Sequence, residues 1–397
     1  MPASPPTPER GPSLERAVDA LIAAFAAAAP FSIVLAQGFG VLAVLGWVAS
    51  RLRRRTPAVA SAARAAAPPL ALPLLAFAAA SVLSALAADH VGAALYQLKS
   101  EWLPIALFWI CVERLRPASK AARFARLAVA AGALSALYAL TQTLRHGAEY
   151  RVHGTLGHYM TLSGVLLLLG LFALALLLFG ARGRRDAPLA LALLPLAAAA
   201  LMTQTRSLWL GFAVGAVPLF WLFDKRTLLV LPLAVVAVLM FAPEPVRQRA
   251  FSFADLADIT VNERVYMWVG GLHVVAAHPL TGAGPGQLDR VYPEHRDPRD
   301  EKEFTHLHNN FVQMAAERGL LGLATWVWIF AAFLVHAVRS WRRTPPGDAR
   351  ALLGGALAAV LGFLVAGTFE CNYRDSEVAQ LLFFAMALGY CAQPEEA

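Results

Sequence analysis

Runs of leucine, alanine and valine long enough to cross a bilayer recur along almost the whole chain, and they restrict the fold more than any other feature. Hydrophobic residues make up 58% of the 397 positions and charged residues 15%, whereas about a quarter of a soluble domain is charged. Because a backbone in lipid must satisfy its own hydrogen bonds, such runs favour helices. The sequence therefore predicts an all-α polytopic membrane protein.

Twelve spans account for the apolar runs. Their approximate ranges are 15–29, 32–50, 68–87, 102–113, 122–143, 159–181, 187–203, 207–223, 227–243, 319–338, 349–369 and 377–392. They divide the chain into residues 1–243 with nine spans, residues 244–318 as one long loop, and residues 319–397 with three spans. The long loop is much richer in charge than the rest and contains amphipathic, helix-like stretches.

Basic residues gather in every second connection between the spans. These clusters are "RLRRR" (51–55), "RLRPASKAARFAR" (114–126), "RGRR" (182–185), "DKR" (224–226) and "RSWRR" (339–343). The positive-inside rule then places both termini in the cytoplasm and residues 244–318 outside. The net charge of +8 follows from these membrane-flanking clusters, so we expect no nucleic-acid partner.

Several cofactor signatures are missing from the sequence. The three cysteines show neither CxxC spacing nor a histidine partner pattern, and no GxxxxGK(S/T), GxSxG or Rossmann glycine pattern occurs in a strand–helix context. We therefore expect no metal and no cofactor. An ATP-driven transporter is also disfavoured.

Arg206 lies where the seventh and eighth spans meet with almost no loop, in "LMTQTRSLWLG". At the external membrane boundary its guanidinium can bind a phosphate, and the start of the next helix adds backbone N–H groups that favour an anion. The alternative is an interfacial arginine that only snorkels to the headgroups. The polar residues on both sides of Arg206 favour an anion site.

Arg264 opens an amphipathic stretch of the long loop, "VNERVYMWVGGLHVVAAHP". The apolar helical stripe expected there consists of Val265, Trp268, Leu272 and Val275. Arg264 then lies at the rim of an apolar surface, unless it is only a solvated residue at a helix start. We expect the following "HPLTGAGPG" to break the helix and residues 289–304 to be irregular.

The stretch "FTHLHNNFVQMAAERGLLG" (304–322) places two histidines directly before the tenth span. Thr305 is a candidate N-cap for a helix that would carry His308 and run through Gln313. A neutral imidazole near pH 7 is a good general base, although both histidines could equally be surface residues of a loop. Glu317 and Arg318 are expected to pair locally or to flank the span.

Other polar residues on the outside are secondary candidates for the same site. In "YQLKSEW" a local ion pair between Lys99 and Glu101 is the simpler interpretation, and the loop that contains Arg151 could line a site or be a turn. The secondary candidates are Lys99, Arg151, Arg290, His306, Asn309, Gln313 and Glu317.

Taken in order, these motifs resemble the O-antigen ligase and polymerase superfamily of membrane glycosyltransferases, and O-antigen ligases most. The resemblance covers the whole chain and includes the long loop before the last three spans and "TQTRS" as an external Arg motif. The residues that fit the family pattern are Arg264, Trp268, Pro279, Gly282, Gly284, His308, Asn309, Gln313, Glu317, Gly319 and Gly322.

The resemblance implies a multi-span, GT-C-like fold in the bacterial inner membrane, surrounded by membrane lipids, with the active site facing the periplasm. It implies transfer of O-antigen polysaccharide from undecaprenyl pyrophosphate to a sugar of lipid A–core, without a metal. Arg206 and Arg264 would bind the donor pyrophosphate and His308 would be the catalytic residue. A single displacement would invert the anomeric configuration.

Three alternatives stay open at this point. An O-antigen polymerase would use the same donor with a second lipid-linked glycan as acceptor. A protein O-oligosaccharyltransferase usually carries an extra periplasmic domain, which is not expected after "CAQPEEA". A transporter or flippase of lipid-linked glycans would need charged or broken-helix features near mid-membrane, whereas the unusual charges here lie at the outer edge.

Overall fold

The computed structural model describes residues 13–53, 69–181, 186–252, 259–300 and 306–392, and all regular structure in these ranges is helical. The helices are α1 (Ser13–Ala28), α2 (Ile33–Arg53), α3 (Ala71–Leu86), α4 (Val91–Gln97), α5 (Lys99–Arg114), α6 (Ala118–His146), α7 (Tyr159–Phe179), α8 (Asp186–Met202), α9 (Arg206–Phe223), the 3₁₀ helix η2 (Lys225–Leu229), α10 (Val230–Phe241), α11 (Glu244–Phe251), α12 (Ile259–Ala277), α13 (Leu288–His295), α14 (Asn310–Trp341), α15 (Asp348–Ala366) and α16 (Ser376–Tyr390).

Each of the twelve predicted spans coincides with a helix, although the helices differ in length. Within the described residues, six are long and apolar enough to cross a membrane, namely α2, α6, α7, α9, α14 and α15, and α3, α8 and α16 are shorter apolar helices. Helix α10 has twelve residues and no buried side chain. At 1.5 Å per residue it is shorter than the roughly 30 Å thickness of a bilayer core.

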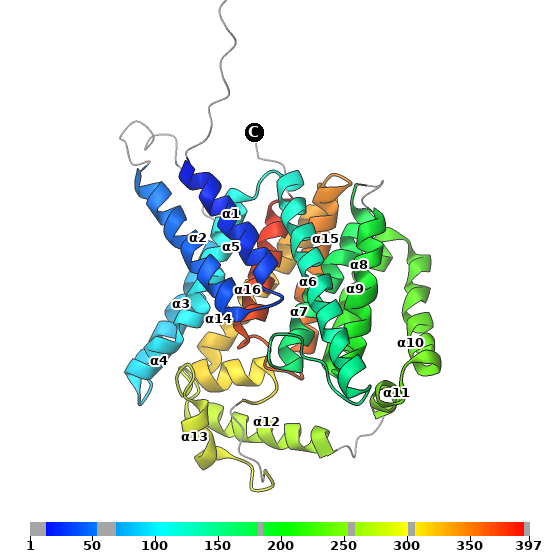
Figure 1. Ribbon diagram of the computed structural model, residues 1–397. Helices are drawn as coiled ribbons and strands as arrows, with labels where there is room; N and C mark the ends of the chain where they lie inside the picture. The colour runs from blue at the N-terminus through cyan, green and yellow to red at the C-terminus, as the bar shows by residue number, and fades with distance from the viewer. Residues whose placement is uncertain (1–12, 54–68, 182–185, 253–258, 301–305, 393–397) are drawn as a thin grey trace, which may run out of the picture.

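The bundle is centred on α7 and α15, which are the most deeply buried of the long apolar helices. Figure 1 shows α1 to α5 on one flank and α10 standing apart on the other, while α12 lies crosswise under one end of the bundle. We call this the site end. The last turns of α2, α5 and α14 carry arginines and lie at the opposite end (Figure 1).

Helix α12 confirms the helix predicted in the long loop, but only half of the predicted apolar stripe is correct, because Trp268 and Val275 pack against the buried cluster and the other two residues do not. Val265 and Leu272 are exposed, and the buried face carries Met267 and Val274 instead. The reason is close packing at two glycines. A Cβ on Gly270 would meet the Tyr292 ring, and one on Gly271 would meet Leu307 and Val312, so this face packs without large side chains of its own. Tyr292 belongs to α13, in a segment that we expected to be irregular.

Helix α14 is broken at Gly319, which has φ 64° and ψ −173°. The turn that follows α12 fits into this break. Its amides at Ala283 and Gly284 donate to the carbonyls of Ala316 and Glu317, at 2.9 and 2.8 Å, and the Leu320 amide donates to the Pro279 carbonyl at 2.9 Å. The turn thus replaces the helical hydrogen bonds that the break removes. The glycines of "HPLTGAGPG" and Gly319 all have a positive φ, a backbone conformation that other residues rarely adopt.

Replacing Gly319 with alanine is expected to destabilise the protein by about 1–3 kcal/mol or more. The new Cβ would lie 2.2 Å from the Leu280 carbonyl oxygen, at a positive φ. The matched control is Gly38→Ala in α2, where nothing lies within 4 Å and alanine is the better helix former. Thermal unfolding in detergent measures both. Equal melting temperatures for the two variants would contradict this role of the break.

Candidate functional site

Arg206 is positioned by the tight turn between α8 and α9. Arg151 holds this turn by donating to the Thr203 and Gln204 carbonyls at 2.9 and 3.1 Å, while Gln204 adopts a left-handed φ of 51°. Thr205 precedes the first residue of α9 but makes no side-chain cap. The N-terminal amides of α9 and the Arg206 guanidinium therefore lie together, which favours an anion. Arg206 itself donates to the Ser252 carbonyl at 2.9 Å.

Arg151 therefore stabilises the turn between α8 and α9 through its hydrogen bonds. Its guanidinium also stacks 3.4 Å from the Tyr159 ring centroid. Burial is the main reason that the pKa of Arg151 is lowered to about 10, which leaves it cationic at neutral pH. The sequence left open whether this loop lines a site or is only a turn, and the structure places it beside the turn that carries Arg206.

His308 lies before α14 and not on it. The helix begins at Asn310, and its N-cap is Asn309, whose side chain accepts hydrogen bonds from the Phe311 and Val312 amides. A helix start near Thr305 was therefore wrong, and Thr305 itself lies outside the described residues. His308 has a positive φ of 46°, which is uncommon for a residue other than glycine. This backbone turns its ring away from the helix axis.

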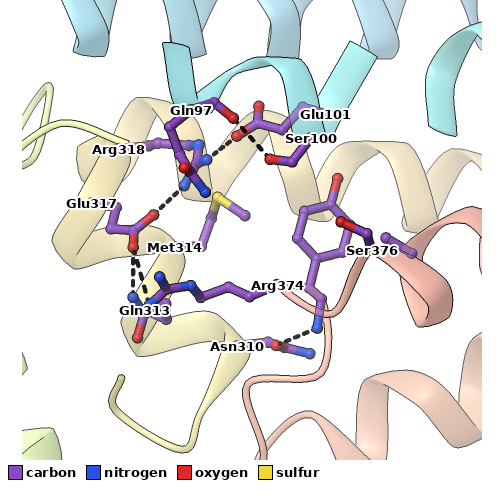
Figure 2. A pocket seen from close by; sticks show the side chains of 12 residues that line it. Gln97, Ser100, Glu101, Asn310, Gln313, Met314, Glu317, Arg318, Arg374 and Ser376 are labelled. Carbon is purple, nitrogen blue, oxygen red and sulfur yellow. Dashed lines mark hydrogen bonds and ion pairs between the residues drawn. The ribbon is translucent and has the colours of Figure 1, made fainter. Parts of the chain in front are cut away.

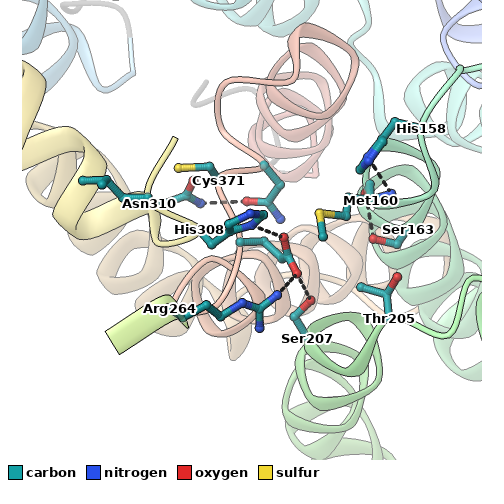
Figure 3. A network of polar contacts seen from close by, with 12 residues as sticks. His158, Met160, Ser163, Thr205, Ser207, Arg264, His308, Asn310 and Cys371 are labelled. Carbon is teal, nitrogen blue, oxygen red and sulfur yellow. Dashed lines mark hydrogen bonds and ion pairs between the residues drawn. The ribbon is translucent and has the colours of Figure 1, made fainter. Parts of the chain in front are cut away.

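Glu370, in the connection between α15 and α16, joins the three predicted site segments. Its carboxylate accepts from Arg264 Nη2 at 3.0 Å and from Ser207 Oγ at 3.2 Å, and it lies 3.3 Å from His308 Nδ1. Ser207, Arg264 and His308 point toward one another in Figure 3. One carboxylate therefore brings together α9, α12 and the segment before α14, which are far apart in the sequence.

The charge of Glu370 is stabilised although the side chain is only 4% exposed. Burial raises the pKa of this carboxyl, but the hydrogen bond with His308, the charge of Arg264 and the Ser207 hydroxyl outweigh burial and hold the pKa below its usual value. Glu370 is therefore ionised at neutral pH. An anionic partner on Nδ1 fixes the ring so that the basic lone pair is on Nε2.

The two histidines of the "HLH" stretch have different surroundings. Their ring centroids are 4.3 Å apart, and His308 Nδ1 lies 3.3 Å from the Glu370 carboxylate. Burial, followed by the charges of His308 and Arg374, lowers the pKa of His306 to about 4. His306 is therefore neutral at physiological pH, whereas His308 lies directly beside the Glu370 carboxylate.

Three side chains of α14 hold the segment that carries His308. Gln313 accepts from the Leu307 amide at 2.9 Å and donates to Glu317 at 2.6 Å, and Cys371 Sγ lies 3.3 Å from the same Gln313 oxygen. Asn310 donates to Asn372 at 2.7 Å and accepts from the Tyr373 amide at 3.1 Å. The segment before α14 is thereby fastened to the connection that carries Glu370.

Two predicted candidates lie away from this cluster. Lys99 is exposed and stacks on the Tyr96 ring at 3.4 Å, and Arg290 is exposed on α13. The expected Lys99–Glu101 ion pair was wrong, because Glu101 pairs with Arg318 of α14. Arg318 also pairs with Glu317 at 2.8 Å, so that local pair is confirmed. Within the described residues no group of three His, Cys, Asp or Glu side chains has the arrangement of a metal site.

Glu370 and Asn310 were missed by the sequence reasoning. Both were visible only as polar residues beside apolar runs, in "GTFECNYRD" and "HNNF". An acidic residue in a short connection that the charge rule places outside was the available signal for Glu370. Its partners are 62, 106 and 163 positions away in the chain, and nothing local identifies them.

In the described part of the chain all regular structure is helical and several helices are apolar and long enough to span a membrane, as in a polytopic membrane protein. A buried Arg–Glu–His cluster lies at one end of this bundle. Residues 189–327 match the family model described as O-antigen ligase. The matched segment contains Arg206, Arg264 and His308, whereas Glu370 lies beyond it. A comparison with curated proteins gave no match.

Proposed function

We propose that this protein is an O-antigen ligase of the bacterial inner membrane, with both termini in the cytoplasm and the site end in the periplasm. It would transfer O-antigen polysaccharide from undecaprenyl pyrophosphate to a sugar hydroxyl of lipid A–core. The observation that carries the proposal is the Glu370 carboxylate, which gathers Arg264, His308 and the start of α9 at one place. The family model that matches residues 189–327 supports the same class of reaction.

In the proposed step the acceptor hydroxyl loses its proton to Nε2 of His308 as its oxygen attacks the anomeric carbon of the donor. The bond between that carbon and the pyrophosphate oxygen breaks, and undecaprenyl pyrophosphate leaves with the electron pair. Attack opposite the leaving group inverts the anomeric configuration. No acid is required, because a pyrophosphate whose charge is neutralised is already a good leaving group.

The cationic residues supply that neutralisation in the proposal. Arg264 uses one of its five N–H donors on Glu370, and Arg206 stands at the N-terminus of α9, where the helix dipole adds positive potential. Glu370 keeps Arg264 in place and stabilises the imidazolium that forms at His308. Such fixed charges lower the barrier because they need no reorganisation during the reaction.

Arg206→Ala is expected to lower kcat/KM for the donor by about 10- to 100-fold, the effect of losing one charge-assisted hydrogen bond. The assay uses purified protein, undecaprenyl pyrophosphate-linked O-antigen and lipid A–core. Arg145→Ala is the matched control, because Arg145 is an exposed arginine at the end of α6 and should leave kcat/KM unchanged. Equal effects of the two substitutions would contradict a pyrophosphate role for Arg206.

The same assay separates the alternatives. Donor chains that lengthen while lipid A–core stays unmodified would identify an O-antigen polymerase. Movement of the donor across vesicle membranes without any new glycosidic bond would identify a transporter. Transfer to lipid A–core is the result expected here.

A further inference from the structure

A second polar pocket lies beside the cluster, between α5, α14 and α16 (Figure 2). It is lined by Gln97, Ser100, Glu101, Asn310, Gln313, Met314, Glu317, Arg318, Tyr373, Arg374, Ser376 and Ala379. The proposed pyrophosphate residues stand on α9 and α12 instead. The pocket and the proposed pyrophosphate site therefore lie on different helices. Asn310 and Arg374 line the pocket and are close in sequence to His308 and Glu370, so the two sites are neighbours.

Two buried side chains in this pocket have unsatisfied polar atoms. Glu101 and Arg318 are 5% and 6% exposed. Glu101 Oε2 and Arg318 Nε each make no hydrogen bond to any described residue, although the same two side chains form an ion pair through their other atoms. A buried polar atom without a partner is costly. Neither atom has accessible surface in the pocket as it stands, so a ligand that supplies both missing partners must draw the Glu101 and Arg318 side chains toward it.

The chemistry of the missing partners specifies the ligand. A carboxylate oxygen needs a donor, and a guanidinium N–H needs an acceptor. A hydroxyl group is both, whereas a phosphate ester dianion has no donor for Glu101 and an ammonium has no acceptor for Arg318. The two carboxylates and two guanidiniums of the lining also balance in charge, which favours a neutral polar group over an ion.

The space available fits part of a sugar. The cavity measures about 30 Å³, and a water needs roughly 10–15 Å³ on this measure, so two oxygen-sized groups can enter but a whole sugar ring cannot. Arg374 lies at the edge of the pocket. Its side chain is 37% exposed and stands 3.8 Å from Glu317, and its charge acts on His306.

We propose that this pocket is the acceptor subsite and that it receives two hydroxyl groups on one edge of the acceptor sugar. Held there, the sugar presents a further hydroxyl to His308 from the side away from the donor. This assignment rests on the proposed glycosyl transfer and adds where the second substrate is recognised. It makes Glu101 and Arg318 residues that select a neutral, hydroxyl-rich acceptor.

Filling the pocket tests this assignment. Ser376→Leu places an apolar side chain at its edge and is expected to raise the KM for lipid A–core about tenfold, the effect of losing one or two hydrogen bonds, with kcat and the donor KM near wild type. Ser100→Leu should act in the same way from α5 and serves if the first variant does not fold. Thr325→Leu is the control, because the Thr325 hydroxyl donates to the Leu321 and Gly322 carbonyls of its own helix and is not among the pocket-lining residues.

The variants are compared with wild-type protein in the same transfer assay. An unchanged acceptor KM in a variant with the wild-type melting temperature would overturn the assignment and leave a pocket that holds only water. A rise in donor KM instead would place the donor there. If wild-type protein transfers glycan only to a second lipid-linked glycan, that glycan is titrated as the acceptor. If it transfers to neither acceptor, the proposed function fails and the subsite fails with it.

Discussion

His308→Ala is expected to lower kcat for glycan transfer by about 10²- to 10⁴-fold, the usual contribution of a general base, while the donor KM changes little. The physical reason is that alanine leaves the attacking hydroxyl without a group to take its proton. The Arg206 and Arg264 guanidiniums would still bind the pyrophosphate. Steady-state kinetics with both substrates varied separate the two effects.

His306→Ala is the matched control for this substitution. The two rings are neighbours, but His306 is held neutral by burial, with its pKa near 4, whereas His308 lies 3.3 Å from the Glu370 carboxylate. We expect its removal to change kcat less than tenfold, far below the general-base effect. A larger loss with His306→Ala than with His308→Ala would reverse the assignment of the two residues.

Glu370→Gln is expected to lower kcat by up to about 10⁴-fold, the loss found when a carboxylate that orients a catalytic histidine is replaced by its amide. Glutamine keeps the shape of the side chain but removes its negative charge. That charge pairs with Arg264 and would stabilise the imidazolium that forms when His308 takes the proton. The buried guanidinium would then lack its anion, which is strongly unfavourable. Part of the activity should return with Glu370→Asp, which restores the charge on a shorter side chain.

A second buried glutamate provides the control for Glu370. Glu377 is 6% exposed in the first turn of α16, seven positions further along the chain, and lies outside the Arg–Glu–His cluster. Glu377→Gln makes the same chemical change at similar burial, so we expect kcat near wild type. If both variants lose activity equally while keeping the wild-type melting temperature, Glu370 has no special role in the reaction.

The helical positions were predictable because lipid allows few backbone structures. An apolar run such as 159–181 identifies α7 almost to the residue. Details that depend on tertiary contacts were not predictable in this way. The N-cap of α14 is Asn309 because Asn310 is fastened to the connection after α15, and the buried face of α12 is set by close packing at Gly270 and Gly271.

The site was predictable only in part. Arg206, Arg264 and His308 stood out by residue type, by position outside the basic clusters, and by resemblance to a family. Glu370 brings Arg264, His308 and Ser207, the neighbour of Arg206, together. It is separated from each of these residues by at least 62 positions in the chain. Gln313 and Glu317 were expected near the site, but their hydrogen bonds to Leu307 and to each other required coordinates, because sequence spacing does not give the path of a non-helical segment.

The break at Gly319 has a consequence for the order in which the protein is assembled. The Ala316 and Glu317 carbonyls at the break accept from amides of the turn after α12, with the Ser84 hydroxyl of α3 as a second donor to Glu317, and unpaired backbone groups are costly at the edge of a bilayer. During synthesis α14 therefore cannot reach its final bent shape when it first enters the membrane. It must wait until the preceding segment has folded across the end of the bundle, so completion of the last three apolar helices and completion of the site are one event.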